Sequence, residues 1–190
     1  MAKKTAKGLT TDELEKGDWI VHKQHGVGQI KGVEEKEIAG NEKKYFRVKI
    51  SSGVYWLPLK KIPDHIRAVS SKYKLNKALR AIRKLPKDLP RNYKTRNKEV
   101  DKRAEGATLH AKGELIRDLH ARRFIDDVNL TTIDERQLNA LRKQFLREMI
   151  VILDVEMEAA EQKLDKALER SIKKLREKEE EEKEKEKEEK

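Results

Sequence analysis

The sequence YFRVKI at residues 45–50 alternates polar and apolar side chains, the pattern of a strand with one buried face. Residues 51–53, SSG, follow as a turn. Similar short apolar or alternating runs recur on both sides, so strands are expected at 19–21, 29–33, 45–50, 54–57 and 65–69. Four or five short strands between residues 17 and 70 predict a small, strongly bent β-barrel, because closure removes exposed edges.

After residue 70 the composition changes to Leu, Ala, Lys and Arg, which favours helices. One apolar face predicts a first helix, on Leu75, Leu79, Ile82 and Leu85. Pro90 fits the first turn of a second helix, and Thr108 could cap a third helix. The third helix has a face of Leu115, Ile116 and Leu119.

Thr132 and Glu135 fit a capping box, so a fourth helix is expected to begin there. Its apolar stripe consists of Leu138, Leu141, Phe145, Met149 and Ile152. A helical pattern continues after a bend near Asp154, through Ala160, Leu164, Leu168 and Leu175. The fold class is therefore α+β with two domains, an N-terminal barrel and a C-terminal all-α domain.

The net charge of +11 is concentrated in the middle of the chain. Residues 1–70 hold 14 basic and 9 acidic side chains, residues 71–125 hold 17 and 6, and residues 126–190 hold 15 and 20. This distribution favours a phosphate-contacting surface on the first helices over a merely solvated one. Residues 177–190 contain only Glu and Lys, so they predict a solvated, helical or partly disordered tail.

The sequence contains no enzyme motif, and we expect a non-enzymatic protein without a cofactor. It has no cysteine, no apolar run long enough for a membrane span, and no phosphate-binding glycine motif. His22 and His25 could approach a metal across a turn, but they have no ligating carboxylate at a useful spacing. The turn around Gly26 is expected to be structural. The default expectation is a soluble cytoplasmic monomer that does not bind membranes.

Several motifs resemble a known family: GDWIVH at 17–22, HGVG at 25–28, IAG at 38–40, KY at 44–45 and WLPL at 56–59. They are similar to the Tudor-like RNA-polymerase-interacting domain shared by CarD/CdnL-type regulators and transcription-repair coupling factors. The chain lacks the helicase motifs of a coupling factor. Its later segments resemble the CarD helical domain instead: RNYK at 91–94 with Asn97, GELIRDL at 113–119, and Glu135-Arg136 with Leu138 and Leu141.

The resemblance implies four segments: a basic flexible N-terminus at 1–13, a polymerase-interacting barrel at 14–70, a DNA-contacting helical domain at 71–176 and a Glu/Lys tail at 177–190. It also implies that the barrel binds the polymerase β subunit. The helical domain would contact promoter DNA without sequence preference and stabilise the open complex, in a nucleoid-associated protein. The alternative is a nucleoid or RNA-binding structural protein whose barrel contacts nucleic acid directly. That alternative would place the positive charge in 17–70.

Five residues are candidates for these contacts. Lys36 stands where the family has a polymerase-facing arginine, although it could equally be a solvated hairpin charge. Trp56 could anchor the polymerase interface or fill the barrel, and we expect burial. Arg91 and Lys94 match basic DNA-contacting residues. Leu89 occupies the position of a tryptophan that wedges into the melted bubble, but it could pack onto the first helix instead.

Overall fold

The computed structural model describes residues 14–23, 25–38, 41–59, 62–126, 128 and 130–188, and the predicted flexible segment 1–13 lies outside them. The chain divides into two units. The first unit comprises Met1–Ser71 and Arg147–Asp154, and the second comprises Lys72–Leu146 and Val155–Lys190. Residues 147–154, expected in the helical domain, thus cluster with the first unit.

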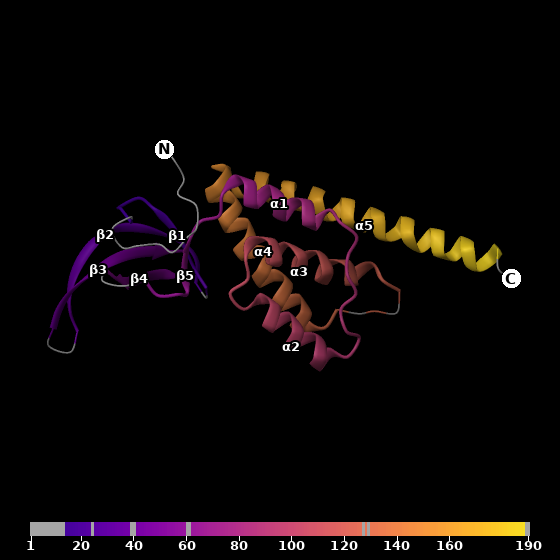
Figure 1. Ribbon diagram of the computed structural model, residues 1–190, viewed down its shortest axis with the longest axis horizontal. Coiled ribbons are helices and arrows are strands. Elements are labelled where there is room, and N and C mark those ends of the chain that lie inside the picture. The colour runs from indigo at the N-terminus through magenta and orange to yellow at the C-terminus, as the bar shows by residue number, and fades with distance from the viewer. Residues whose placement is uncertain are drawn as a thin grey trace. The chain divides into compact units, whose positions relative to one another are not determined.

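The first unit contains one antiparallel sheet of five strands (Figure 1): β1 Trp19–His22, β2 Gly26–Ile38, β3 Asn41–Ile50, β4 Gly53–Pro58 and β5 Ile66–Ala68. Their order is β4-β3-β2-β1-β5. Over the described residues β4 and β5 do not pair, so the prediction of a closed barrel is wrong. Pro58 ends β4 and β5 has only three residues, which leaves little backbone for a closing ladder.

Two glycines shape this sheet. Gly26 is the first residue of β2 and has φ +75, a conformation that favours glycine. Gly26, Val27 and Gly28 all pair with β1, so the segment expected to be a tight turn is the start of a strand. At Gly28 a Cβ atom would lie 2.7 Å from Val48 Cγ1 and 2.8 Å from Ile50 Cγ2. Only glycine therefore lets β2 pass this close to the side chains of β3.

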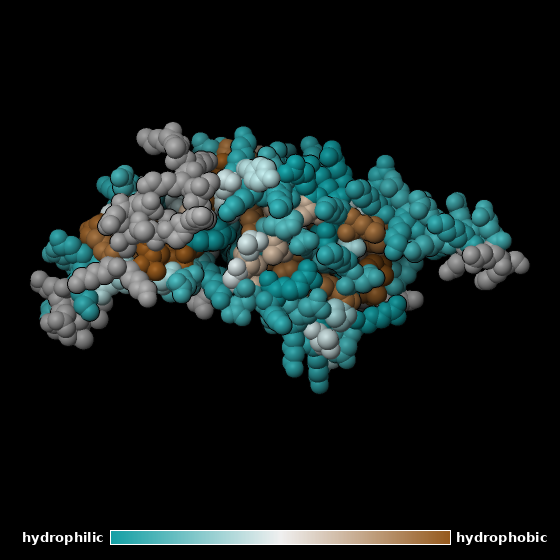
Figure 2. Space-filling view, in the orientation of Figure 1, coloured by the Kyte–Doolittle hydropathy of each residue, from teal (hydrophilic) through white to brown (hydrophobic). Residues whose placement is uncertain are grey.

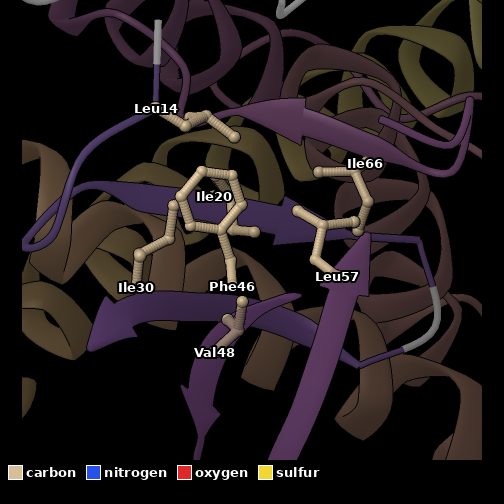
Figure 3. Packing of buried hydrophobic residues seen from close by; sticks show 7 residues of the cluster. All are labelled: Leu14, Ile20, Ile30, Phe46, Val48, Leu57 and Ile66. Atoms are coloured by element: carbon tan, nitrogen blue, oxygen red, sulfur yellow. The ribbon is translucent and has the colours of Figure 1, made fainter. Parts of the chain in front are cut away.

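The core of the first unit lies on one face of the sheet (Figure 3) and consists of Leu14, Ile20, Ile30, Phe46, Val48, Leu57 and Ile66. The alternation in β3 buries Phe46 and Val48 and exposes Arg47, as its sequence predicts. The last turns of the helix that ends at Leu153 also belong to this unit. There the buried Glu148 accepts two hydrogen bonds of 2.7 Å from Arg67 and one of 3.0 Å from the Ser70 amide. Burial alone would raise the pKa of Glu148, but these hydrogen bonds outweigh it and lower the pKa.

The second unit is helical, and of the following helices only the part of α4 from Arg147 onward falls outside it: α1 Lys72–Ile82, α2 Tyr93–Ala104, α3 Leu109–Ala121, the 3-10 turn Arg122–Phe124, α4 Thr132–Leu153 and α5 Met157–Glu188. Three expectations for α1 are confirmed, since Leu75, Leu79 and Ile82 are buried. Leu85 lies beyond the end of α1 and is exposed, so its place on the buried face was wrong.

The caps of the helices show why each begins where it does. The Asn92 side chain caps α2 by accepting from the amides of Lys94 and Thr95, so α2 begins three residues after Pro90. Thr108 caps α3 as predicted, and its Oγ1 accepts from the Ala111 amide. At α4 the capping residue is Thr131, one position earlier than the predicted Thr132.

The predicted stripe of α4 is confirmed: Leu138, Leu141, Phe145, Met149 and Ile152 are all buried. Asp154 has φ +57 and ends the helix at the expected bend. α5 then continues as one helix through Glu188, and its described side chains beyond Glu180 are exposed. Figure 2 shows hydrophilic side chains along this part of α5. No described helix combines the length and the apolarity that a membrane crossing needs.

Candidate protein and nucleic-acid interfaces

Trp56 lies on the solvent face of the first unit's sheet. The residue is 40% exposed, so the expectation that it fills the core is wrong. The sheet register explains this orientation: Leu57, its neighbour in β4, is buried, and successive residues of a strand face opposite sides. An exposed tryptophan on a sheet face is a typical anchor of a protein interface.

The neighbours of Trp56 hold its ring in place. Lys36 Nζ lies 3.3 Å from the ring centroid, and Trp56 Nε1 donates a 2.8 Å hydrogen bond to Glu34 Oε2. Arg47, which pairs with Trp56 across β3 and β4, lies 3.3 Å from the other oxygen of Glu34. We call Glu34, Lys36, Arg47 and Trp56 the tryptophan patch. The structure therefore brings together the two predicted polymerase-contacting residues, Lys36 and Trp56.

The electrostatics of the tryptophan patch fit a partner with an acidic or polar surface. A cation over an exposed indole ring contributes about 0.5–1 kcal/mol, enough to orient Lys36 without removing its charge from solvent. Glu34 neutralises one of the two cations. The remaining positive charge and the flat ring are available to a partner.

A cluster of histidines lies elsewhere in the same unit. The ring of His22 is 4.3 Å from that of His25, 4.7 Å from that of His65 and 5.3 Å from that of Tyr55. Burial, together with His25 and His65, lowers the pKa of His22 to about 4. No group of three or more ligands in the described part of the chain has metal-binding geometry. Tyr55 Oη is buried without a hydrogen-bond partner among the described residues, and burial raises its pKa to about 12.

The second candidate interface is the connector between α1 and α2 with the first turns of α2. Arg91 and Lys94 are exposed, as a phosphate contact requires. Tyr93 is also exposed, at 50%. Lys94 Nζ lies 5.9 Å from its ring centroid. Lys98 and Lys102 continue the exposed positive charge along α2.

Leu89 is only 5% exposed and belongs to the core of the helical unit. This burial favours the packing alternative for Leu89 over the wedge, since a buried side chain would have to leave the core before it could enter a base step. The backbone on both sides of Leu89 is fixed by hydrogen bonds to buried side chains. The Lys87 amide donates a 3.0 Å hydrogen bond to Asp118 Oδ1, upstream of Leu89.

Arg96 holds the downstream side of the connector. Its guanidinium donates to the carbonyls of Pro90 and Arg91, at 2.9 and 2.8 Å. It also forms a two-pronged pair with Asp134 at the start of α4, at 2.8 and 2.9 Å. Both side chains are buried. Burial alone would raise the pKa of Asp134, but the hydrogen bonds from Arg96 and Thr131 outweigh it and lower the pKa.

Asp134 is also the capping partner of Thr131. The Thr131 amide and hydroxyl both donate to Asp134 Oδ2 at 2.9 Å, and the Asp134 amide donates to Thr131 Oγ1 at 3.2 Å. One carboxylate therefore begins α4 and fixes α2 and the connector.

Sequence reasoning missed the buried charges that position this site, Arg96 and Asp118. A signal for Arg96 exists: α2 offers only Val100 as a buried apolar residue, and Arg96 stands one turn before it on the same face. A helix that has a single apolar contact must bury something else on that face.

The first unit thus belongs to the class of small antiparallel β-domains that present an exposed aromatic and cationic face. Residues 14–70 match the family model of the CarD-like/TRCF RID domain. The chain therefore contains a CarD-like RNA polymerase-interacting domain, which confirms the resemblance of the motifs between residues 17 and 59 and associates the domain with RNA polymerase interaction in transcription regulation.

Proposed function

We propose that this chain is a non-enzymatic regulator of transcription initiation that docks on the β subunit of RNA polymerase and contacts promoter DNA. The observation that supports this most directly is the family match of residues 14–70 together with an exposed tryptophan patch on the matched domain. The match identifies the kind of partner, and the tryptophan patch offers a surface to it.

The tryptophan patch has the composition of a docking site. Trp56 supplies exposed ring area, and its hydrogen bond to Glu34 and its contact with Lys36 fix the ring before binding. Little side-chain entropy is then lost when a partner covers it. β4, which carries Trp56, is an edge strand of the sheet, so a strand of the partner could also pair with it.

The α2 surface supports DNA contact. Arg91 and Lys94 are exposed near the start of α2. Buried Arg96 and Asp118 fix the backbone of the connector through hydrogen bonds. Phosphate contacts of this kind are independent of sequence and weaken with salt. A regulator that binds polymerase and DNA together would slow the closing of a melted promoter, so we propose stabilisation of the open complex as its effect.

Polymerase binding can be tested by comparing two single charge reversals on β2. Lys36→Glu should place a negative charge against the Trp56 ring and weaken binding of the full chain to purified β subunit at least tenfold. Lys31→Glu, an exposed position on the same strand, is the control and should have a small effect. Equal binding by both variants would contradict the docking assignment, and the structural-protein alternative would then be favoured if DNA binding persisted.

A further inference from the structure

A groove in the helical unit is lined by cations and contains no carboxylate. It has a volume of about 360 Å³ and is formed by Arg83, just after α1, and by one face of α5, with Ala159, Gln162, Lys163, Lys166 and Arg170. α1 packs against α5, as Figure 1 shows, and the Ser171 hydroxyl donates a 2.7 Å hydrogen bond to the Lys84 carbonyl beside the groove. The position of Arg83 against α5 is therefore fixed.

The charges of α5 are sorted by face. Lys163, Lys166 and Arg170 are spaced by one helical turn and line the groove. Two acidic residues of the same turns are directed elsewhere: Asp165 pairs with Arg142 at 2.8 Å, and Glu169 lines a different groove beside His120. No acidic residue is among the described side chains that line the cationic groove.

The groove cations lack partners in the part of the chain that the structure describes. None of Arg83, Lys163, Lys166 and Arg170 lies within 4.0 Å of a described carboxylate oxygen. Arg83 Nε is buried and has no acceptor among the described residues. Four like charges that converge on one groove repel each other, and an anion would relieve that repulsion.

The positive surface continues from the groove along α1. The helix contains no acidic residue, and Tyr73, Lys77 and Arg80 form an exposed stripe along it. From Tyr73 to Arg80 the stripe is ~10 Å long, a length over which duplex DNA presents roughly six phosphates. The polar side chains of the groove lining are four cations and the Gln162 amide, and cationic donors of this kind suit phosphate oxygens.

We propose that the α1–α5 groove is a second nucleic-acid contact of this protein, which binds backbone phosphates independently of the α2 surface. It rests on the proposed DNA binding by the helical unit but not on Arg91, on Lys94 or on polymerase. The groove cations would each neutralise a phosphate and release counterions. Two separate phosphate-binding surfaces would fix the direction in which DNA runs over the helical unit.

The test is the salt dependence of duplex DNA binding by the full chain without polymerase. Lys163→Gln with Lys166→Gln removes two phosphate contacts and should reduce the slope of log Kd against log salt by about 1.8. Affinity at 0.1 M salt should fall about 10- to 60-fold. The matched control is Lys178→Gln with Lys185→Gln, which changes the net charge equally on the exposed end of α5 and should leave the slope unchanged.

Two further variants separate this proposal from the proposed function. Lys163→Arg with Lys166→Arg keeps both charges and should retain the slope. Arg91→Ala with Lys94→Ala should reduce the slope by a similar amount, additively with the groove variant. A slope that changes in the α2 variant but not in the groove variant would overturn the groove and leave the proposed function intact. The reverse result would support the groove and refute the α2 contact.

Inorganic tripolyphosphate serves as the competing small anion. If the groove binds the backbone of nucleic acid, tripolyphosphate should displace DNA only as strongly as its ionic strength predicts. Stoichiometric binding of tripolyphosphate that the groove variant abolishes, with DNA binding unchanged, would overturn the proposal in favour of a small-ligand site.

Discussion

Arg96→Met should destabilise the helical unit alone. The substitution removes four hydrogen bonds, two to Asp134 and one each to the carbonyls of Pro90 and Arg91. It leaves a fully buried carboxylate without its counterion, and breaking a buried pair in this way costs about 3–5 kcal/mol. The volume of the side chain is nearly kept, so the expected loss reflects charge and hydrogen bonding rather than a cavity.

The two units allow this loss to be assigned to one of them. Both tryptophans, Trp19 and Trp56, lie in the first unit, so tryptophan fluorescence follows that unit during urea unfolding. Far-UV circular dichroism at 222 nm follows mainly the helices. The free energy of unfolding falls by about 2 kcal/mol per molar urea. The urea concentration at the midpoint of the dichroism transition should therefore fall by roughly 1.5–2.5 M, while the midpoint of the fluorescence transition stays unchanged.

Two controls complete the experiment. Arg80→Met removes an exposed arginine from α1 and should cost less than about 0.5 kcal/mol. Adding Asp134→Asn to Arg96→Met removes the unpaired charge, so the double variant should be more stable than Arg96→Met by about 1–2 kcal/mol. An unchanged dichroism midpoint in Arg96→Met would refute the reasoning, and equal shifts of both signals would show that the units unfold together.

Three further predictions concern single residues. Gly28→Ala places a Cβ against Val48 and should cost the first unit about 1–3 kcal/mol, seen as a lower fluorescence midpoint with little change in dichroism. His22 has its pKa lowered to about 4 in the fold against 6.5 ordinarily, so the unfolded chain takes up a proton first as pH falls. The first unit should lose about 1–3 kcal/mol between pH 6.5 and 4, and His22→Phe should flatten this dependence; an equal slope in the variant would contradict it. Asp118→Asn weakens the acceptor of the Lys87 amide and should speed hydrogen exchange at Lys87 at least tenfold, whereas unchanged exchange would show that Asp118 does not hold the connector.

Local patterns in the sequence predicted most of the helices and strands. Whether the sheet closes depends on tertiary contacts that these patterns do not specify. The period of two in β3 and the period of 3.6 in α4 each identified the buried face, because burial of one face is what those periods encode. The closure of the sheet depends on whether β4 reaches β5, and no local pattern specifies that contact. The side that Trp56 faces was predictable, since Leu57 beside it is the better core residue.

The start of α4 shows how a distant partner selects between equal local signals. Thr131 with Asp134 and Thr132 with Glu135 both fit a capping box, one residue apart. The structure uses the first because Asp134 is also the partner of Arg96, 38 positions earlier in the chain. A cap that satisfies a buried arginine is more stable than one exposed to solvent, so the tertiary pair sets the helix boundary.

The same reasoning explains how a chain so rich in charge presents a defined surface. Most charged residues are solvated, and their free energy differs little between one arrangement of the chain and another. They therefore cannot by themselves select a conformation. The buried charges can, because each must find a partner. Arg96 pairs with Asp134, and Asp118 pairs with Arg117. Both also bind the backbone of the connector, Asp118 at Lys87 and Arg96 at Pro90 and Arg91. The connector that carries Arg91 is therefore held from both ends before any ligand arrives, and phosphate binding there requires little further ordering of the chain.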